Sequence, residues 1–246
     1  MKWIRRFSFA LIAVLLLAVL GFTIWGSTPA APMPEALAAL QSDGQVTVKN
    51  TGWLEFKPVG KEPRTGFIFY PGARVDYRAY APTARAIAAQ GFLVVIAPMP
   101  LNLAVLAPGK AADVIAAYPA IQRWAVGGHS LGGAMAANFA KNNPGKVEGL
   151  ILTASYPASS DDLSQSNLKV VSIYASLDGL ATGPKIDASR ALLPITTIWV
   201  KIEGGNHAQF GWYGAQAGDN PAAISRAAQQ ETTIQASIDL LASLGN

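Results

Sequence analysis

The chain has no cysteine and only two histidines, His129 and His207, among its 246 residues. The absence of cysteine excludes disulfide bonds, zinc sites with cysteine ligands and a thiol nucleophile. Two histidines leave little room for a histidine-rich metal site, and we expect neither a metal nor an organic cofactor. Charged residues are also few, at 14%, whereas apolar residues make up 51%. This composition excludes a disordered chain and provides material for a core.

The excess of positive charge lies at the N-terminus. Lys2, Arg5 and Arg6 are three of the 19 basic residues, and no acidic residue occurs among the first 31. The rest of the chain therefore has 16 basic and 15 acidic residues, a near balance that offers no basic surface to nucleic acid. We expect a small-molecule substrate and a membrane as partners, and the sequence leaves the oligomeric state open.

Residues 7–25 form an apolar run of 19 residues without charge. A membrane-spanning helix needs about 20 such residues, whereas the apolar part of a secretory signal has about 7–15. The length favours a retained anchor, and the alternative is a signal that is cleaved near residues 28–31, which would release a secreted protein. The basic residues before the run predict that the rest of the chain lies outside the cytosol. We expect an anchor or signal over 1–31, a tether over 32–44 and one globular domain over 45–246.

Short apolar strands alternate with helical segments after residue 45. An antiparallel pair is predicted at 46–48 and 53–56, and further strands at 66–70, 92–97, 125–129, 149–154, 170–175 and 196–202. Helices are predicted at 80–90, 111–124, 131–142, 187–193 and 222–244. Strands that are apolar on both faces predict an α/β fold, with a mostly parallel sheet covered by helices on both faces. In such a sheet, functional side chains follow the carboxyl ends of the strands.

The segment GHSLGG at residues 128–133 contains the pattern G-x-S-x-G between a predicted strand and a predicted helix. Glycines on both sides of the serine allow a sharp turn that exposes its hydroxyl at the edge of the sheet. Ser130 is therefore the candidate nucleophile. The alternative is a tight glycine turn in which the serine only caps the following helix.

A serine nucleophile needs a base within hydrogen-bonding reach. His129 adjoins Ser130 in the tight turn, so we expect its side chain to leave in another direction and to pack beneath the turn. His207 follows the last predicted strand in the segment EGGNH, at the correct edge of the sheet. By elimination His207 is the candidate base, and the alternative role is that of a solvated loop histidine.

The base needs a carboxylate to orient it. The acidic residues considered between Ser130 and His207 are Glu148, Asp161, Asp162, Asp178, Asp187 and Glu203. Glu148 lies at a strand entrance, Asp161 and Asp162 lie in a polar loop, and Asp187 begins a helix. Glu203 is close to His207 on the same strand exit but stays possible. Asp178, just past the strand at 170–175, is the preferred residue.

An acyl-transfer site also needs amide donors for the developing oxyanion. The amide of Leu131, directly after the nucleophile, is one candidate. The amide of Ala73, in the turn PGA after the strand at 66–70, is the other. Arg74 and Asp76 follow in the same loop, where they either pair with each other or line the mouth of the site.

The order of elements, the GGHSLGG turn, the PGA turn, the LDG acid loop and the GGNH base loop resemble those of serine hydrolases with the α/β-hydrolase fold. The resemblance covers nearly all residues from about 45 onward. It implies a Ser130–His207–Asp178 triad and an acyl-enzyme intermediate. The PGA turn replaces the HGGG loop of one group of esterases. The compact size is similar to that of dienelactone hydrolases, although their nucleophile is a cysteine where this chain has Ser130.

We therefore predict a membrane-anchored carboxylic-ester hydrolase whose domain lies outside the cytoplasm. The same triad also suits an amidase or peptidase, a thioesterase or an acyltransferase, because the triad does not specify the leaving group. A hydrolase-like protein that only binds its ligand is the alternative without catalysis. The sequence specifies neither the natural ester nor its acyl-chain length.

Overall fold

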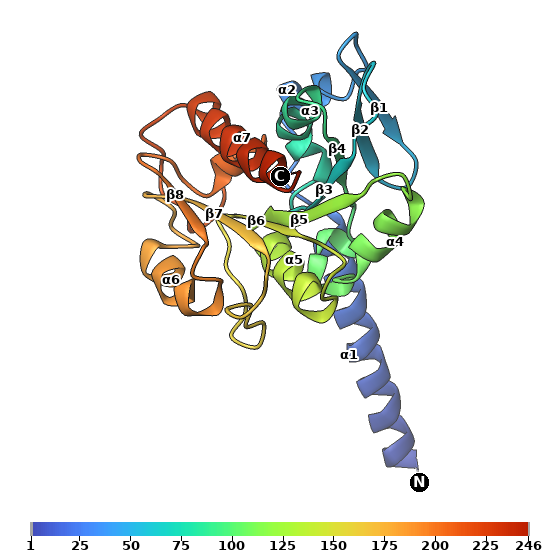
Figure 1. The fold of residues 1–246 in the computed structure, drawn as a ribbon. Helices are drawn as coiled ribbons and strands as arrows, with labels where there is room; N and C mark the ends of the chain where they lie inside the picture. Colours follow the sequence, from blue (N-terminus) through green and yellow to red (C-terminus); the bar gives the residue numbers. More distant parts are fainter. Residues whose placement is uncertain (1, 246) are drawn as a thin grey trace.

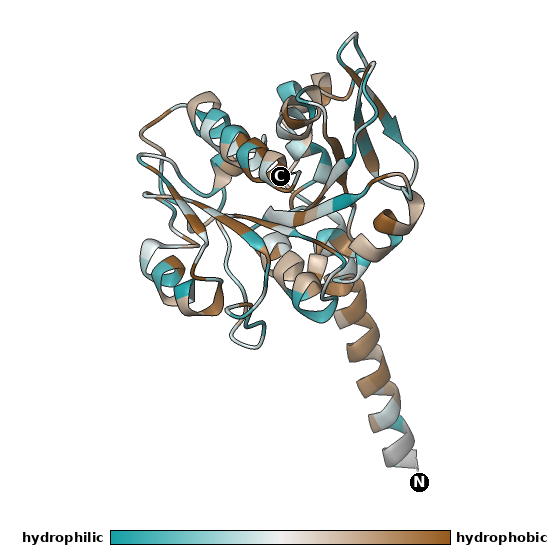
Figure 2. Cartoon of the chain, viewed as in Figure 1, coloured by the Kyte–Doolittle hydropathy of each residue, from teal (hydrophilic) through white to brown (hydrophobic). Residues whose placement is uncertain are grey.

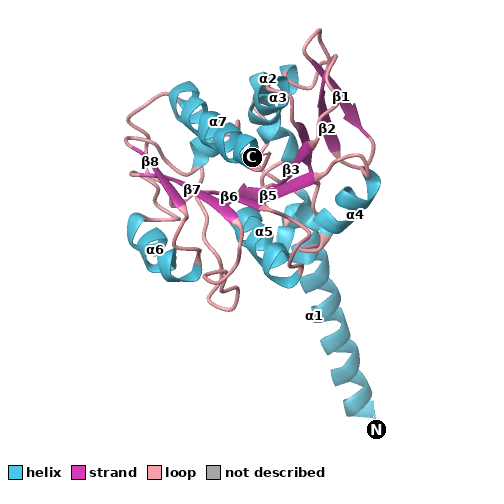
Figure 3. Ribbon diagram, viewed as in Figure 1, coloured by secondary structure: helices cyan, strands magenta, loops and turns pink. Residues whose placement is uncertain are grey.

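The structure is a computed structural model that describes residues 2–245. Within these residues an eight-stranded sheet has the order β1-β2-β4-β3-β5-β6-β7-β8, with helices on both faces (Figure 1, Figure 3). The strands from β3 to β8 are parallel to one another, and β2 pairs antiparallel with both β1 and β4. The predicted α/β fold with a mostly parallel sheet is confirmed.

The elements have the following bounds. The strands are β1 (Val46–Asn50), β2 (Leu54–Pro58), β3 (Thr65–Tyr70), β4 (Leu93–Ile96), β5 (Arg123–His129), β6 (Gly149–Thr153), β7 (Lys169–Ala175) and β8 (Ile198–Ile202). The α-helices are α1 (Lys2–Ser27), α2 (Pro34–Ala38), α3 (Ala81–Ala89), α4 (Lys110–Ala117), α5 (Leu131–Asn142), α6 (Gly183–Ala188) and α7 (Arg226–Ser243). Short 3-10 helices are η1 (Tyr77–Tyr80), η2 (Pro100–Asn102), η3 (Ala104–Leu106), η4 (Ser189–Leu192) and η5 (Ala208–Phe210).

The sheet lies between two apolar layers, because successive side chains of a strand point to opposite faces. In β3, Phe67 and Phe69 belong to one layer, whereas Ile68 and Tyr70 belong to the other. Helices α3 and α7 contribute to the first layer, and α4 and α5 contribute to the second. Every residue of β3, β4 and β6 is buried, as expected for parallel strands covered on both faces. Because the strands themselves are buried, functional side chains are expected in the loops at the carboxyl edge of the sheet.

Three predicted helix boundaries are wrong. The helix predicted over 111–124 ends at Ala117, because Pro119 disfavours helical geometry at the preceding residue, and the chain then enters β5 at Arg123. The helix predicted from 222 begins only at Arg226, where the side chain of Ser225 accepts a hydrogen bond from an amide of the first turn. The helix predicted over 187–193 is the end of a longer helical segment formed by α6 and η4.

Helix α1 leaves the domain as a separate apolar stem (Figure 2). Its part Arg6–Ser27 has 22 residues and is long and apolar enough to cross a membrane, and the apolar 18-residue window within it has no residue buried in the domain. At about 1.5 Å per residue this segment covers the hydrocarbon thickness of about 30 Å. A signal sequence near an N-terminus has the same features, so α1 is a candidate for either role.

The segment that follows α1 lies against the domain. Ala30 forms a short parallel bridge with Val75, Pro32 forms an antiparallel bridge with Tyr213, and the side chain of Ala36 in α2 is fully buried. These contacts come from positions on both sides of the predicted boundary at residue 31. The division into anchor, tether and domain stays a prediction.

Candidate active site

Ser130 lies in a tight turn between β5 and α5. Its backbone has φ 54° and ψ −125°, a region that residues other than glycine rarely adopt. The turn is packed tightly, since a Cβ atom at Gly132 would lie 2.1 Å from the carbonyl oxygen of Tyr70. A strained nucleophile turn with glycine at such a close contact is typical of strand–serine–helix hydrolases.

His207 and Asp178 meet at the carboxyl edge of the sheet, after β8 and β7 respectively. The Nδ1 atom of His207 lies 2.8 Å from Oδ2 of Asp178, and the two side chains are 1% and 0% exposed. The other carboxylate oxygen of Asp178 accepts hydrogen bonds from the amides of Leu180 and Ala181, at 2.8 and 2.7 Å. Because an ionised carboxylate can only accept, Nδ1 carries the proton and Nε2 of a neutral His207 is left as an acceptor.

Ser130 and His207 line the same cavity, which has a volume of about 260 Å³. Its other lining residues are mostly small or apolar: Leu131, Ala134, Ala154, Ser155, Tyr156, Leu180 and Ala181. Nε2 of His207 is buried and has no hydrogen-bond partner within residues 2–245. It therefore forms no hydrogen bond with Ser130 in this structure. Bonds between a nucleophile and its base are often long before substrate binds. The arrangement therefore leaves a proton acceptor and a hydroxyl in one cavity.

Of the two candidate oxyanion residues, only Leu131 lines this cavity. Leu131 is the first residue of α5, where backbone amides have no partner within the helix. Ala73 lies between β3 and η1 and is absent from the cavity lining in the described residues. Its loop is nevertheless adjacent to the nucleophile turn, because the backbone of Tyr70 and Pro71 packs directly against Gly132.

His129 is fully buried and is not among the residues that line the cavity, and its ring centre lies 4.5 Å from that of His207. Its Nδ1 lies 2.9 Å from the hydroxyl of Tyr80, which also accepts a hydrogen bond from the amide of Gly72 at 3.1 Å. Burial raises the pKa of Tyr80, so its hydroxyl stays protonated and donates to His129. Burial, and then the nearby His207, hold the pKa of His129 well below its usual value. His129 is therefore neutral. Through Tyr80, it links the loop of Gly72 to the residue that precedes Ser130.

The other acidic candidates have partners elsewhere. Glu148 pairs with Arg123, Asp187 with Arg190 and Glu203 with Lys201, while Asp161 accepts from Asn138 and Asp162 from the amide of Ser164. Arg74 and Asp76 do not pair with each other either. Asp76 pairs with Arg78 at 2.6 Å, and the side chain of Arg74 bonds to residues at the end of α1.

Sequence reasoning missed two residues that hold the loop of His207. The carboxylate of Asp219 accepts from the amides of Gly179 and His207, both at 3.1 Å, and so joins the acid loop to the base loop. The side-chain amide of Gln229 in α7 is fully buried and makes two hydrogen bonds with the backbone of Asn206, at 3.0 and 2.7 Å. No local pattern marks either residue, because both act across loops that are distant in sequence.

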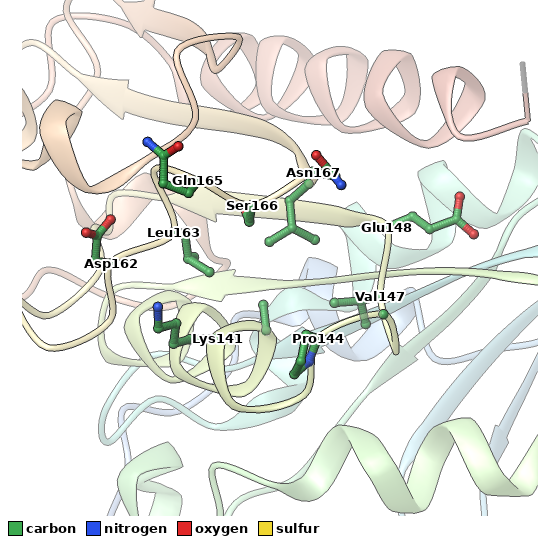
Figure 4. A pocket seen from close by; sticks show the side chains of 12 residues that line it. Lys141, Pro144, Val147, Glu148, Asp162, Leu163, Gln165, Ser166 and Asn167 are labelled. Carbon is green, nitrogen blue, oxygen red and sulfur yellow. The ribbon is translucent and has the colours of Figure 1, made fainter.

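A larger cavity of about 520 Å³ lies elsewhere (Figure 4). Its lining comes from the end of α5, the approach to β6 and the loop before β7, with Lys141, Glu148 and Asp162 among its residues. These positions are at the opposite edge of the sheet from Ser130, and none of the proposed site residues lines it. Over residues 2–245, no group of three or more His, Cys, Asp or Glu side chains is arranged to bind a metal ion.

Several solved structures are similar to this chain. A predicted CIB-like hydrolase from Thermoplasma acidophilum aligns with a TM-score of 0.59 at 15% identity, over 81% of this chain and 98% of the other. A thermophilic esterase from Thermogutta terrifontis aligns with 0.60 at 13%, over 82% and 92%. A dienelactone hydrolase from Anabaena variabilis aligns with 0.60 at 14%, over 80% and 99%. At such identities the likeness shows the fold alone.

A comparison with curated protein sequences finds no match. The family model described as "Alpha/beta hydrolase family" matches residues 66–231, about two thirds of the chain. The matched region includes Ala73, Ser130, Leu131, Asp178 and His207. This match agrees with the resemblance of the motifs and with the sheet order. The chain therefore belongs to the alpha/beta hydrolase family of enzymes.

Proposed function

We propose that the protein is a serine esterase that uses Ser130 as nucleophile, His207 as general base and Asp178 as the carboxylate that orients the base. The observation that carries the proposal is the buried His207–Asp178 pair, in which Nε2 of His207 has no other partner, together with a cavity that both His207 and Ser130 line. Among the structural relatives, one is described as an esterase and one as a dienelactone hydrolase, which supports the same class of substrate.

The reaction would follow the acyl-enzyme route. Oγ of Ser130 attacks the ester carbonyl carbon while Nε2 of His207 takes the hydroxyl proton, and the amides of Leu131 and Ala73 stabilise the oxyanion. The tetrahedral intermediate then expels the alcohol, which leaves with the proton held by His207. Water, deprotonated by His207, attacks the acyl-enzyme, releases the carboxylic acid and restores Ser130.

The cavity favours a small or slender acyl group. Its volume is about 260 Å³, and alanine and leucine side chains form much of its lining. Pockets for drug-sized ligands are usually about 300–1,000 Å³. We expect short-chain esters to be better substrates than long-chain esters.

We further propose that α1 anchors the enzyme in a membrane with the domain outside the cytoplasm. Support comes from the length and exposure of the segment Arg6–Ser27 and from the basic residues near its start. A signal that is removed after export is the alternative, and N-terminal sequencing of the mature protein distinguishes the two.

The proposal is tested with the full chain in detergent or nanodiscs, using short p-nitrophenyl esters and a fluorophosphonate probe. We expect ester hydrolysis and a covalent adduct that peptide mapping assigns to Ser130. Ser130→Ala should abolish both, whereas Ser159→Ala, on an exposed loop, should change neither. Folded wild-type protein that reacts with neither the esters nor the probe would refute the proposal.

A further inference from the structure

The carboxyl-terminal end of α1 is docked on the domain, unlike the rest of the helix. Gly26 is buried, and a Cβ atom there would lie 2.8 Å from Cβ of Leu101 in η2. Gly21, one and a half turns earlier, has nothing within 4 Å of the same position. Of the two glycines in α1, only Gly26 is in close contact with the loop after β4, and a larger residue at Gly26 would push the helix and the loop apart.

The last carbonyl groups of α1 are capped by side chains of the domain. Arg74 donates from Nε to the carbonyl of Trp25 at 3.0 Å and from Nη2 to the carbonyl of Thr28 at 2.9 Å. Its guanidinium carbon also lies 4.5 Å from the centre of the Trp25 ring. Asn102 donates to the carbonyl of Gly26 at 2.9 Å. Carbonyls at a helix end need partners, and a cation there also complements the helix dipole.

The chain after α1 continues this contact toward the catalytic loops. The amide of Ala30 donates to the carbonyl of Arg74 at 2.7 Å, and the carbonyl of Ala30 accepts from the amide of Asp76 at 3.1 Å. The amide of Met33 then donates to the carbonyl of Trp212, in the loop after His207, at 2.8 Å. Residues 28–33 thus connect the loop of Ala73 with the loop of the proposed base.

The two loops that contact α1, after β3 and after β4, contain residues with strained backbones. Arg74, Leu101 and Asn102 have φ values of 54°, 50° and 55°, in the left-handed region that favours glycine. A residue held in such a conformation costs about 1–3 kcal/mol and persists only where its surroundings impose it. The amide of Arg74 donates to the carbonyl of Asn102 at 2.8 Å, so the strained positions support each other. The side chains of Arg74 and Asn102 bond to residues 25–28, and the carbonyl of Arg74 accepts from Ala30, while other hydrogen bonds of the two loops stay within the domain.

We infer that α1 is retained in the working enzyme and that its docked end positions the loop of Ala73, with Arg74 as the positioning residue. This inference rests on the proposed function, in which Ala73 supplies an oxyanion amide. Arg74 follows Ala73 directly, so a change in its backbone moves the Ala73 amide. Cleavage near residues 28–31 would remove the carbonyls that Arg74 and Asn102 cap.

The first test compares Gly26→Leu with the matched control Gly21→Leu in the full chain, reconstituted in nanodiscs. Leucine favours a helix at both positions, so only the docking contact differs. We expect Gly26→Leu to lower kcat about tenfold with little change in KM, a fraction of what the loss of a whole oxyanion donor costs. The inhibition constant of a trifluoromethyl ketone, which forms an oxyanion, should rise by a similar factor. Gly21→Leu should leave all three values unchanged.

The second test does not need activity. Hydrogen exchange of the amides at residues 72–76 should be faster in Gly26→Leu and in Arg74→Ala than in the wild type. The control is Arg190→Ala, because Arg190 also lies over a tryptophan, Trp199, at 4.1 Å, but belongs to η4, far from α1 in sequence. Arg190→Ala should exchange as the wild type does in this segment. The intact mass of active enzyme extracted from membranes should include residues 2–27.

Two outcomes would overturn the inference. One is fully active mature enzyme that begins after Ser27. The other is a Gly26→Leu variant that matches Gly21→Leu in kcat, in inhibitor affinity and in hydrogen exchange. If the wild type hydrolyses no ester, the proposed function fails by itself, and the exchange and mass measurements still decide whether α1 is docked and retained.

Discussion

The acid–base side of the candidate site and its oxyanion side are attached to the domain in different ways. Asp178 and His207 are fixed by groups within the α/β domain, namely the amides after Asp178 and the side chains of Asp219 and Gln229. The loop of Ala73 is bonded in addition to α1 and the residue after it, which lie outside the sheet. In the proposed site, the acid–base half is therefore held by the domain itself, whereas the oxyanion half also contacts a neighbouring segment.

The largest effect should come from the acid–base half, with Asp178→Asn. An amide in place of the carboxylate cannot support the imidazolium that forms during the reaction, so kcat should fall about 10³-fold or more. The measurement is steady-state hydrolysis of a short ester. Asp162→Asn, at an exposed carboxylate whose partner is the amide of Ser164, is the control and should keep full activity. Equal activity of the two variants would contradict the role of Asp178.

A smaller decrease in kcat is expected from Asp219→Asn. The change removes the charge from a side chain that accepts hydrogen bonds from the amides of Gly179 and His207. Hydrogen bonds to charged groups contribute about 1.5–3 kcal/mol each. We expect kcat to fall about tenfold to a hundredfold, with a lower melting temperature. Asp239→Asn, on the exposed side of α7, is the control. If Asp219→Asn changed the melting temperature alone, the residue would support the fold and not the base.

Tyr80→Phe tests the link between the Gly72 loop and His129. The variant leaves the amide of Gly72 and Nδ1 of His129 without their shared partner, and such buried groups cost about 1–3 kcal/mol when unsatisfied. Denaturant unfolding should show a destabilisation of this size. Tyr77→Phe, whose hydroxyl has only a long contact with Asn50, should be nearly neutral. A Tyr80→Phe variant as stable as the wild type would mean that water or another group replaces the hydroxyl.

The smallest effect is a pH dependence of stability that comes from His129. Its pKa in the folded protein lies well below the unfolded value of about 6.5, because burial disfavours the charged form. The unfolded chain therefore binds the extra proton first, so stability is full above pH 6.5 and falls as the pH decreases below it. The slope is at most about 1.4 kcal/mol per pH unit. His129→Gln should reduce the difference in unfolding free energy between pH 7 and pH 5, whereas His207→Gln should retain the His129 contribution.

Much of the fold was predictable because most strands are rich in apolar residues, and turns that contain glycine follow β3, β5, β7 and β8. The positions of Ser130, Asp178 and His207 after β5, β7 and β8 follow from that pattern, and the catalytic roles stay proposals. Helix boundaries were less predictable, since apolar residues continue past Pro119 into β5 with no change of composition. There the backbone restriction imposed by one proline outweighs the apolar pattern.

The partner of Arg74 was not predictable from local sequence. An arginine two residues from Asp76 suggests an ion pair, but Asp76 pairs with Arg78 on its other side, and Arg74 bonds to carbonyls 46 and 49 residues earlier. Backbone carbonyls leave no trace in a sequence as potential partners, because every residue has one. Asp219 and Gln229 escaped prediction for the same reason, since their partners are main-chain groups of distant loops.

The hydrogen bonds between residues 25–33 and the domain also limit how the helix and the domain can move relative to each other. A flexible linker, such as one rich in Gly and Ser, would let the domain change its orientation and position relative to the helix. Here the end of α1 and the loops of Arg74 and Asn102 are joined by direct contacts, so rotation of α1 in a bilayer would turn the domain with it. If α1 spans a membrane as proposed, the proposed catalytic edge keeps a constant height and tilt above the lipid, and only molecules that reach that level meet it.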